Sequence, residues 1–93
     1  MNRWEITILH IIASNAGSAS LKHIYSEIPK HIDLTSNHIK ITYGVPNYHH
    51  QTRAHIGDLL DNGDVNRVSR GRYSITSHGQ LRIKKLSELM FPS

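Results

Sequence analysis

The amino-acid sequence predicts a small, mainly helical α+β domain, in which several helices are followed by one β-hairpin and a final helix. Apolar residues recur at helical spacing over most of the chain, and their spacing changes to alternation only after Gly63. The chain has 93 residues, of which 38% are hydrophobic, which suits one core but not two. We therefore expect a single domain over residues 1–93, with its core at about residues 4–80 and its last helix at about residues 77–90.

The first two helices are predicted from apolar stripes. Residues 4–13 carry apolar side chains on one broad face. Ser20 is placed to cap a second helix over residues 21–31, and Pro29 should distort or end that helix near its last turn. Between the two helices we expect residues 18–19 to form a short extended link.

Residues 33–46 have the weakest pattern in the chain. Thr35 or Ser36 is expected to cap one short turn. Residues 43–46, which contain a glycine and a proline, are expected to form a loop.

A longer helix is predicted over residues 48–62, with Asn47 as its N-cap and Gly63 after its end. Projection at about 100° per residue places an apolar face toward the core. The residues on that face are Thr52, Ile56, Leu59 and Leu60. Small or hydrogen-bonding side chains occupy the outward face, where Lys and Glu would be the ordinary choice. The residues on the outward face are Asn47, His50, Gln51, Ala54 and Asp58, with Arg53 and Gly57 at its edge.

Strands are predicted at residues 65–68 and 72–76, joined by a tight turn in which Gly71 supplies a positive φ. Thr76 or Ser77 then caps the last helix. The resulting order is helix, helix, short helix or loop, helix, hairpin and helix. This is the order of a winged helix-turn-helix domain, in which the hairpin is the wing.

Positive charge is concentrated near the end of the chain. The formal net charge is +4, yet residues 1–64 contain more acidic than basic side chains. Residues 65–93 contain six Lys and Arg residues against Glu88 alone. The positive electrostatic field of such a concentrated group of basic residues favours a polyanionic partner.

The predicted partner is double-stranded DNA. A helix that enters the major groove needs small or hydrogen-bonding side chains at its leading end, since Asn and Gln pair with adenine and Arg with guanine. The predicted base-reading residues are Asn47, His50, Gln51, Arg53 and Ala54. The predicted contacts to phosphate or the minor groove are Ser20, Lys22, Arg67, Arg70 and Arg72. The alternatives are that these are ordinary exposed side chains and that Ser20 is only a cap. We expect a solvated face of the last helix at Arg82, Lys84 and Lys85, with an extension of the positive field as the alternative.

The sequence predicts no catalytic residue, metal or cofactor. The absence of cysteine excludes disulfides, iron–sulfur clusters and thiolate zinc sites. Among the eight histidines, none lies three or four residues from another, so no helical turn offers a preformed pair of ligands. A site assembled from loops by His38, His49 and His78 is the alternative. The seven acidic residues show no spacing that would hold a divalent cation.

The location expected from the sequence is cytoplasmic, without membrane contact. The apolar runs are far shorter than a membrane span. The first residues lack the length and cleavage pattern of a secretory signal.

Residues 53–65, RAHIGDLLDNGDV, and residues 70–76, RGRYSIT, carry a family resemblance. They resemble the winged-helix domains attached to restriction endonucleases. Both the N-terminal domain of Mrr-type enzymes and the DNA-reading module of enzymes that cut adenine-methylated DNA are similar. The resemblance covers roughly residues 5–80, and its motifs are moderately specific, because winged helices of transcription regulators share several of them.

The resemblance implies duplex DNA binding through residues 48–62, with Arg53 toward the DNA and Arg70 and Arg72 in the wing. If methylated DNA is the target, Tyr43 and Tyr48 are the best-placed aromatic residues for the methyl group, with core packing as their alternative role. The sequence departs from the family in two ways. The aromatic residue that many Mrr-type domains carry at position 53 is absent, and Gly57 weakens the helix.

We therefore expect a non-catalytic DNA-binding module that forms the target-reading part of a restriction or modification-dependent system, with N6-methyladenine as a candidate mark. Cutting would need a nuclease domain or subunit outside this chain, and we expect a monomer or weak dimer. One alternative is a standalone dimeric transcription regulator that pairs through Ile83, Leu86 and Met90. Another is a protein–protein adaptor.

Overall fold

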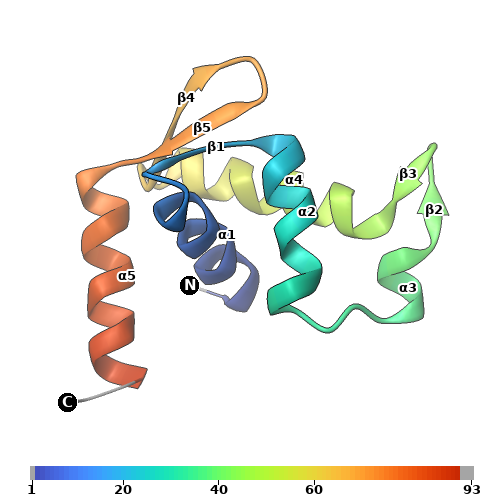
Figure 1. Ribbon diagram of the computed structural model, residues 1–93, viewed down its shortest axis with the longest axis horizontal. Coiled ribbons are helices and arrows are strands. Elements are labelled where there is room, and N and C mark those ends of the chain that lie inside the picture. The colour runs from blue at the N-terminus through green and yellow to red at the C-terminus, as the bar shows by residue number, and fades with distance from the viewer. Residues whose placement is uncertain (1, 91–93) are drawn as a thin grey trace.

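The computed structural model describes residues 2–90, with the side chains of residues 2–86, and Figure 1 shows its elements. Within these residues the molecule is a mainly helical α+β domain, as predicted. The elements are α1 (Arg3–Ser14), β1 (Ser18–Ser20), α2 (Leu21–His31), α3 (Ser36–Ile39), β2 (Ile41–Thr42), β3 (Val45–Pro46), α4 (Asn47–Asp61), β4 (Val65–Ser69), β5 (Arg72–Ile75) and α5 (Ser77–Met90). The bounds of α1, α2 and α4 lie within one residue of those predicted.

The larger sheet is antiparallel, with strand order β1-β5-β4. Its register pairs Ala19 with Tyr73 and Val65 with Ile75. The extended link predicted at residues 18–19 is thus an edge strand, which sequence spacing could not show because its partner β5 lies far along the chain. The backbone N–H of Leu21 donates to the carbonyl of Gly71 at 2.7 Å, which ties the start of α2 to the turn of the β4–β5 hairpin.

The loop predicted at residues 43–46 is instead part of a second, shorter hairpin. Strands β2 and β3 pair antiparallel, with Ile41 opposite Pro46. Tyr43 and Gly44 form its turn with φ values of 55° and 82°, and two successive positive φ values are typical of a type I′ hairpin turn. This turn has a weak signal in the sequence because tyrosine rarely occupies this conformation.

The predicted N-cap of α4 was wrong. The cap position is held by Pro46, which has no side-chain hydrogen bond to offer, and Asn47 is the first residue of the helix. Asn47 serves the preceding segment instead. Its backbone N–H donates to the carbonyl of Lys40 at 2.9 Å, and its side-chain amide donates to the carbonyl of Asn37 at 2.8 Å.

The core lies around α1, which sits between α5 and α2 in Figure 1 and also contacts α4 and β5. The predicted inward face of α4 is confirmed, since Thr52, Ile56 and Leu59 are buried and Leu60 is half-buried. The hydroxyl of Thr52 donates to the carbonyl of Tyr48 at 2.7 Å, so this buried polar group is satisfied. The buried core cluster is Ile8, Leu9, Ile11, Ile12, Ala19, Ile24, Ile28, Ile56, Leu59, Val65 and Tyr73.

Helix α5 is fixed at its start by Thr76 and Asp64. The Thr76 hydroxyl accepts from the backbone N–H of Gly79 at 3.0 Å, which confirms it as the cap. Arg82 was expected on a solvated face, but its Nη1 donates to Oδ2 of fully buried Asp64 at 2.6 Å. A buried carboxylate needs such a partner. Of the helices described over residues 2–90, none is long and apolar enough to cross a membrane.

Candidate nucleic-acid interface

A hollow of about 470 Å³ lies between α4, the β4–β5 hairpin and the start of α2. Three arginines line it, namely Arg53 from the middle of α4 and Arg67 and Arg70 from the hairpin. Its remaining lining residues are Leu21, Ile56, Gly57, Leu60, Gly71 and Tyr73. The fold therefore gathers guanidinium groups from two elements around one concave surface, which we call the arginine hollow.

The charge of the arginine hollow is uncompensated by its own walls. None of the described residues that line it is acidic. All three arginines are exposed. The guanidinium carbon of Arg67 lies 5.8 Å from the centroid of the Tyr73 ring, which orients that side chain by a cation–π contact. Fork-shaped guanidinium groups with no internal carboxylate partner suit the binding of phosphate or base edges.

Beside the hollow, α2 and α4 are joined by an aromatic stack that the sequence did not reveal. The rings of Tyr25 and His49 are parallel, with centroids 3.8 Å apart. Burial raises the pKa of Tyr25, while the nearby charge of Arg53 acts in the opposite direction. Burial also lowers the pKa of His49, and His50 adds to this shift. The stack fixes the position of α4 relative to α2.

The predicted base-reading residues divide into two groups. Asn47 and His50 are half-buried and engaged, since His50 Nε2 lies 2.7 Å from the carbonyl oxygen of Thr42. Together with the Asn47 amide, this contact holds α3 and the β2–β3 hairpin against the start of α4. Arg53 and Ala54 are exposed, and Gln51 is half-buried. The side chains of this second group make no such hydrogen bond among the described residues.

The predicted backbone-contacting residues divide in the same way. Arg67 and Arg70 line the hollow, whereas Arg72 Nε donates to the hydroxyl of Ser18 at 3.0 Å on the neighbouring strand. The Ser20 hydroxyl accepts from the backbone N–H of His23 at 3.0 Å, which is the plain capping role. Lys22 is exposed beside it.

The two candidate aromatic residues for a methyl group differ in exposure. Tyr43 is 94% exposed at the tip of the β2–β3 hairpin, so its expected alternative role in core packing is wrong. Tyr48 is half-buried and packs against the core cluster. In Figure 1 the two hairpins stand at the two ends of α4 and extend upward on the same side. Tyr43 is therefore the more accessible of the two aromatic side chains, and its ring makes an edge contact with that of His50, with centroids 6.2 Å apart.

Comparison with protein-family models, with curated proteins and with solved structures found no match to this chain.

Proposed function

We propose that this chain is a winged helix-turn-helix module that binds double-stranded DNA, with α4 as the recognition helix and the β4–β5 hairpin as the wing. The observation that carries the proposal is the arginine hollow, where Arg53 of α4 and Arg67 and Arg70 of the hairpin meet without an acidic neighbour in its lining. The element order and the β1-β5-β4 sheet support the winged-helix assignment. The residues 53–65 and 70–76 that resemble restriction-enzyme domains supply both sides of this hollow.

In this proposal the residues have distinct tasks. Arg53, Gln51 and Ala54 face the bases, while Arg67 and Arg70 hold the flanking backbone or enter the minor groove. Asn47 and His50 support the interface by holding α3 and the β2–β3 hairpin, respectively, against α4. Lys22 adds positive charge at the start of α2, and Arg72 contributes less because Ser18 already engages it.

The biological role that fits best is target reading in a restriction or modification-dependent system in the cytoplasm. Cutting would come from a nuclease domain or subunit outside this chain. The exposed ring of Tyr43 supports recognition of a modified base such as N6-methyladenine, because a methyl group needs an apolar surface. Selection of binding sites from random duplexes, with and without adenine methylation, identifies the preferred sequence and mark.

Arg53→Ala tests the proposed recognition helix. The substitution should weaken binding to a selected duplex by about 1–3 kcal/mol and relax the preference at one base pair. Fluorescence anisotropy with a labelled duplex at low salt measures both effects. Arg72→Ala is the matched control, since it removes an arginine that lies outside the hollow, and its loss should be smaller. Equal losses for the two variants would remove Arg53 from its assigned role.

A second candidate function is a protein–protein adaptor, which a different surface favours. Ile39, Ile41 and Tyr43 are 58%, 67% and 94% exposed and lie close in sequence on α3 and the β2–β3 hairpin. Failure to bind any duplex at low salt, together with capture of a partner that Tyr43→Ser abolishes, would support this function instead.

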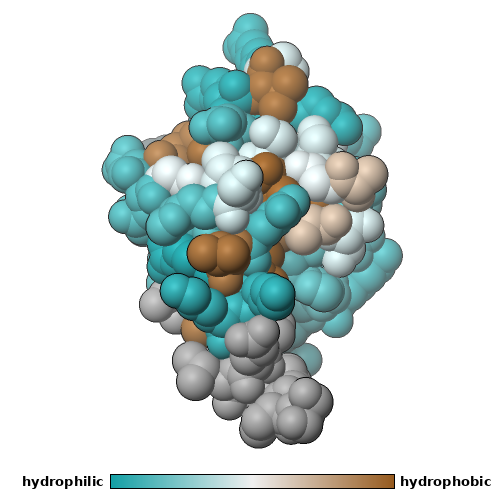
Figure 2. All heavy atoms as spheres, turned by 90° about the vertical axis from the view of Figure 1, so that its left-hand side faces the viewer, coloured by the Kyte–Doolittle hydropathy of each residue, from teal (hydrophilic) through white to brown (hydrophobic). Residues whose placement is uncertain are grey.

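The alternative of a dimeric regulator has less support. Ile83, assigned to the dimer face, packs against the core, and Leu86 is half-buried, while the side chain of Met90 lies outside the described residues. Figure 2, which looks onto the α5 side, shows hydrophobic spots separated by hydrophilic surface. Leu81, at 56% exposed, is a large apolar side chain of α5 that remains available. Sedimentation of the free protein distinguishes a monomer from the stable dimer that this alternative requires.

A further inference from the structure

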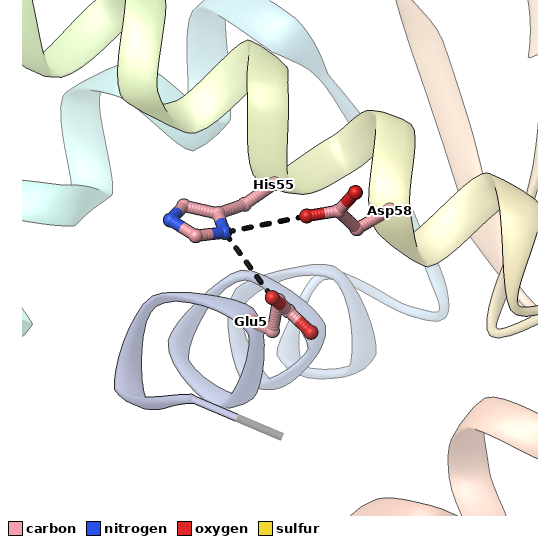
Figure 3. Close-up of side chains that lie close together, drawn as sticks. All are labelled: Glu5, His55 and Asp58. Carbon is pink, nitrogen blue, oxygen red and sulfur yellow. Dashed lines mark hydrogen bonds and ion pairs between the residues drawn. The ribbon is translucent and has the colours of Figure 1, made fainter.

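A compact cluster of possible metal ligands lies on the flank of α4 that faces α1. Figure 3 shows Glu5 of α1 directed toward His55 of α4, with Asp58 one turn further along the same helix. His55 Nδ1 lies 3.1 Å from Glu5 Oε2 and 3.9 Å from Asp58 Oδ2. One ligand atom from each residue lies within 4.8 Å of the other two. None of these residues lines the arginine hollow.

The charges in this cluster are unbalanced. Glu5 is only 8% exposed, and its carboxylate faces the carboxylate of Asp58 across a single imidazole. Among the ion pairs of the described residues, neither acid has a Lys or Arg partner. The Asn2 side-chain amide donates to Glu5 Oε2 at 2.9 Å, but this donor is neutral. A nearly buried carboxylate without a fixed cation is costly, so a bound cation would stabilise the arrangement.

We propose that Glu5, His55 and Asp58 form a binding site for a divalent transition-metal ion of the zinc type. Zinc accepts imidazole nitrogen and carboxylate oxygen at about 2.0–2.2 Å, which places the ligands of a tetrahedral site about 3.3–3.6 Å apart. The observed separations of 3.1 and 3.9 Å bracket that spacing. Asp58 is 61% exposed, so its side chain can adjust and a water molecule can complete the coordination.

The ligand types also set the selectivity. An imidazole ligand suits zinc, nickel and copper, whereas magnesium prefers oxygen ligands alone. The site joins the first turn of α1 to the middle of α4, so a bound ion adds a cross-link between two helices of the core. Metal binding should therefore raise the midpoint of thermal unfolding, because an ion that binds only the folded chain stabilises it.

Trp4 provides a built-in reporter of this site. It is the only tryptophan of the chain, and its ring stacks on that of His55 with centroids 6.1 Å apart and planes 18° apart. Nickel alone, added to the intact protein, should quench Trp4 fluorescence to saturation, and zinc should reverse the quenching. Calorimetric titration with zinc alone should give one ion per chain, while magnesium should neither bind nor stabilise.

Substitutions separate this site from other imidazoles. His55→Gln should abolish both the quenching by nickel and the binding of zinc. Asp58→Asn changes an exposed position and should weaken zinc binding at least roughly 10–100-fold, which is the cost of losing a group that only supports a metal ligand. His38→Gln is the matched control, because His38 is the other imidazole against Trp4, at 5.5 Å, and glutamine can keep its capping role. His31→Gln controls for the second histidine pair, formed with His10.

The proposal predicts that both control variants bind zinc like the unaltered chain. It is overturned if zinc gives no saturable binding or stabilisation in the folded protein, or if the response survives in His55→Gln and Asp58→Asn. It is also overturned if only the control variants lose the response. Circular dichroism spectra of the variants and of the unaltered chain establish that each protein compared is folded.

Discussion

The two flanks of α4 carry opposite charge, and different parts of the chain complete them. On one flank, Arg53 joins Arg67 and Arg70 of the β4–β5 hairpin around the arginine hollow. On the other, His55 and Asp58 meet Glu5 of α1. Successive residues of an α-helix are rotated by about 100° around its axis, so positions 53 and 55 lie about 200° apart. A single helix can therefore present both surfaces.

The difference between the flanks indicates what each can bind. The lining of the basic flank contains no acid, so its charge is free for an anionic partner such as duplex DNA. On the acidic flank Glu5 is 8% exposed, and one ligand atom from each of the three residues lies within 4.8 Å of the others, a spacing that suits a single cation. The buried face of α4 between them sets the position of both.

Leu59→Ala should disturb both flanks together and have the largest effect. Leu59 is fully buried on the packing face of α4, and its truncation should lower the free energy of unfolding by about 2–5 kcal/mol. Urea denaturation measures the loss. Leu81→Ala is the matched control because Leu81 is 56% exposed, and its effect should stay within about 0.5 kcal/mol. Similar losses in the two variants would contradict the assigned packing face.

Gly57→Ala should separate stability from binding on the basic flank. An added Cβ at Gly57 meets no atom within 4 Å, so the helix should gain about 0.5–1 kcal/mol of stability. The same methyl group narrows the arginine hollow and should weaken duplex binding while leaving zinc binding unchanged. The control is Gly63→Ala, which should destabilise the protein because Gly63 has a φ of 78°. A stability change of the same sign in both variants would contradict this account.

His49→Gln should produce the smallest effect, at the contact between α4 and α2. Burial, assisted by His50, lowers the pKa of His49 in the folded protein, so the unfolded chain takes up this proton more readily. Stability should therefore fall as the pH drops below about 6.5, the ordinary value for histidine. In His49→Gln this decline should be shallower in urea unfolding curves between neutral and mildly acidic pH. An unchanged decline would show that other groups cause it.

The sequence predicted the elements whose signals are local. The Ser20 cap and the apolar stripe gave the bounds of α2, and Gly71 marked the turn of the β4–β5 hairpin. It predicted residues 18–19 as an extended link but not their pairing in the sheet, because three residues show no pattern of their own and their partner β5 is distant in sequence. It missed the β2–β3 turn because Tyr43 adopts a positive φ without a typical turn residue at that position.

The candidate sites were predictable to different degrees. The charge distribution and the spacing of apolar residues were enough to select Arg53, Arg67 and Arg70 as candidates. Their grouping with Leu21 around one hollow depends on tertiary packing, which the sequence does not show. The contact of His50 with the carbonyl oxygen of Thr42 could not be predicted, because the β2–β3 hairpin that contains Thr42 was not predicted. The cluster of Glu5 with His55 was also invisible, since fifty residues separate the two side chains.

The salt dependence of duplex binding tests the central claim most directly. If the arginine hollow and its surroundings neutralise about four phosphates, the logarithm of the association constant should fall with the logarithm of salt concentration with a slope of roughly −3 to −4. Arg70→Ala should weaken binding to all sequences alike and reduce the magnitude of this slope by about 1. Binding without salt dependence, or a slope unchanged in Arg70→Ala, would contradict the claim that this surface holds DNA.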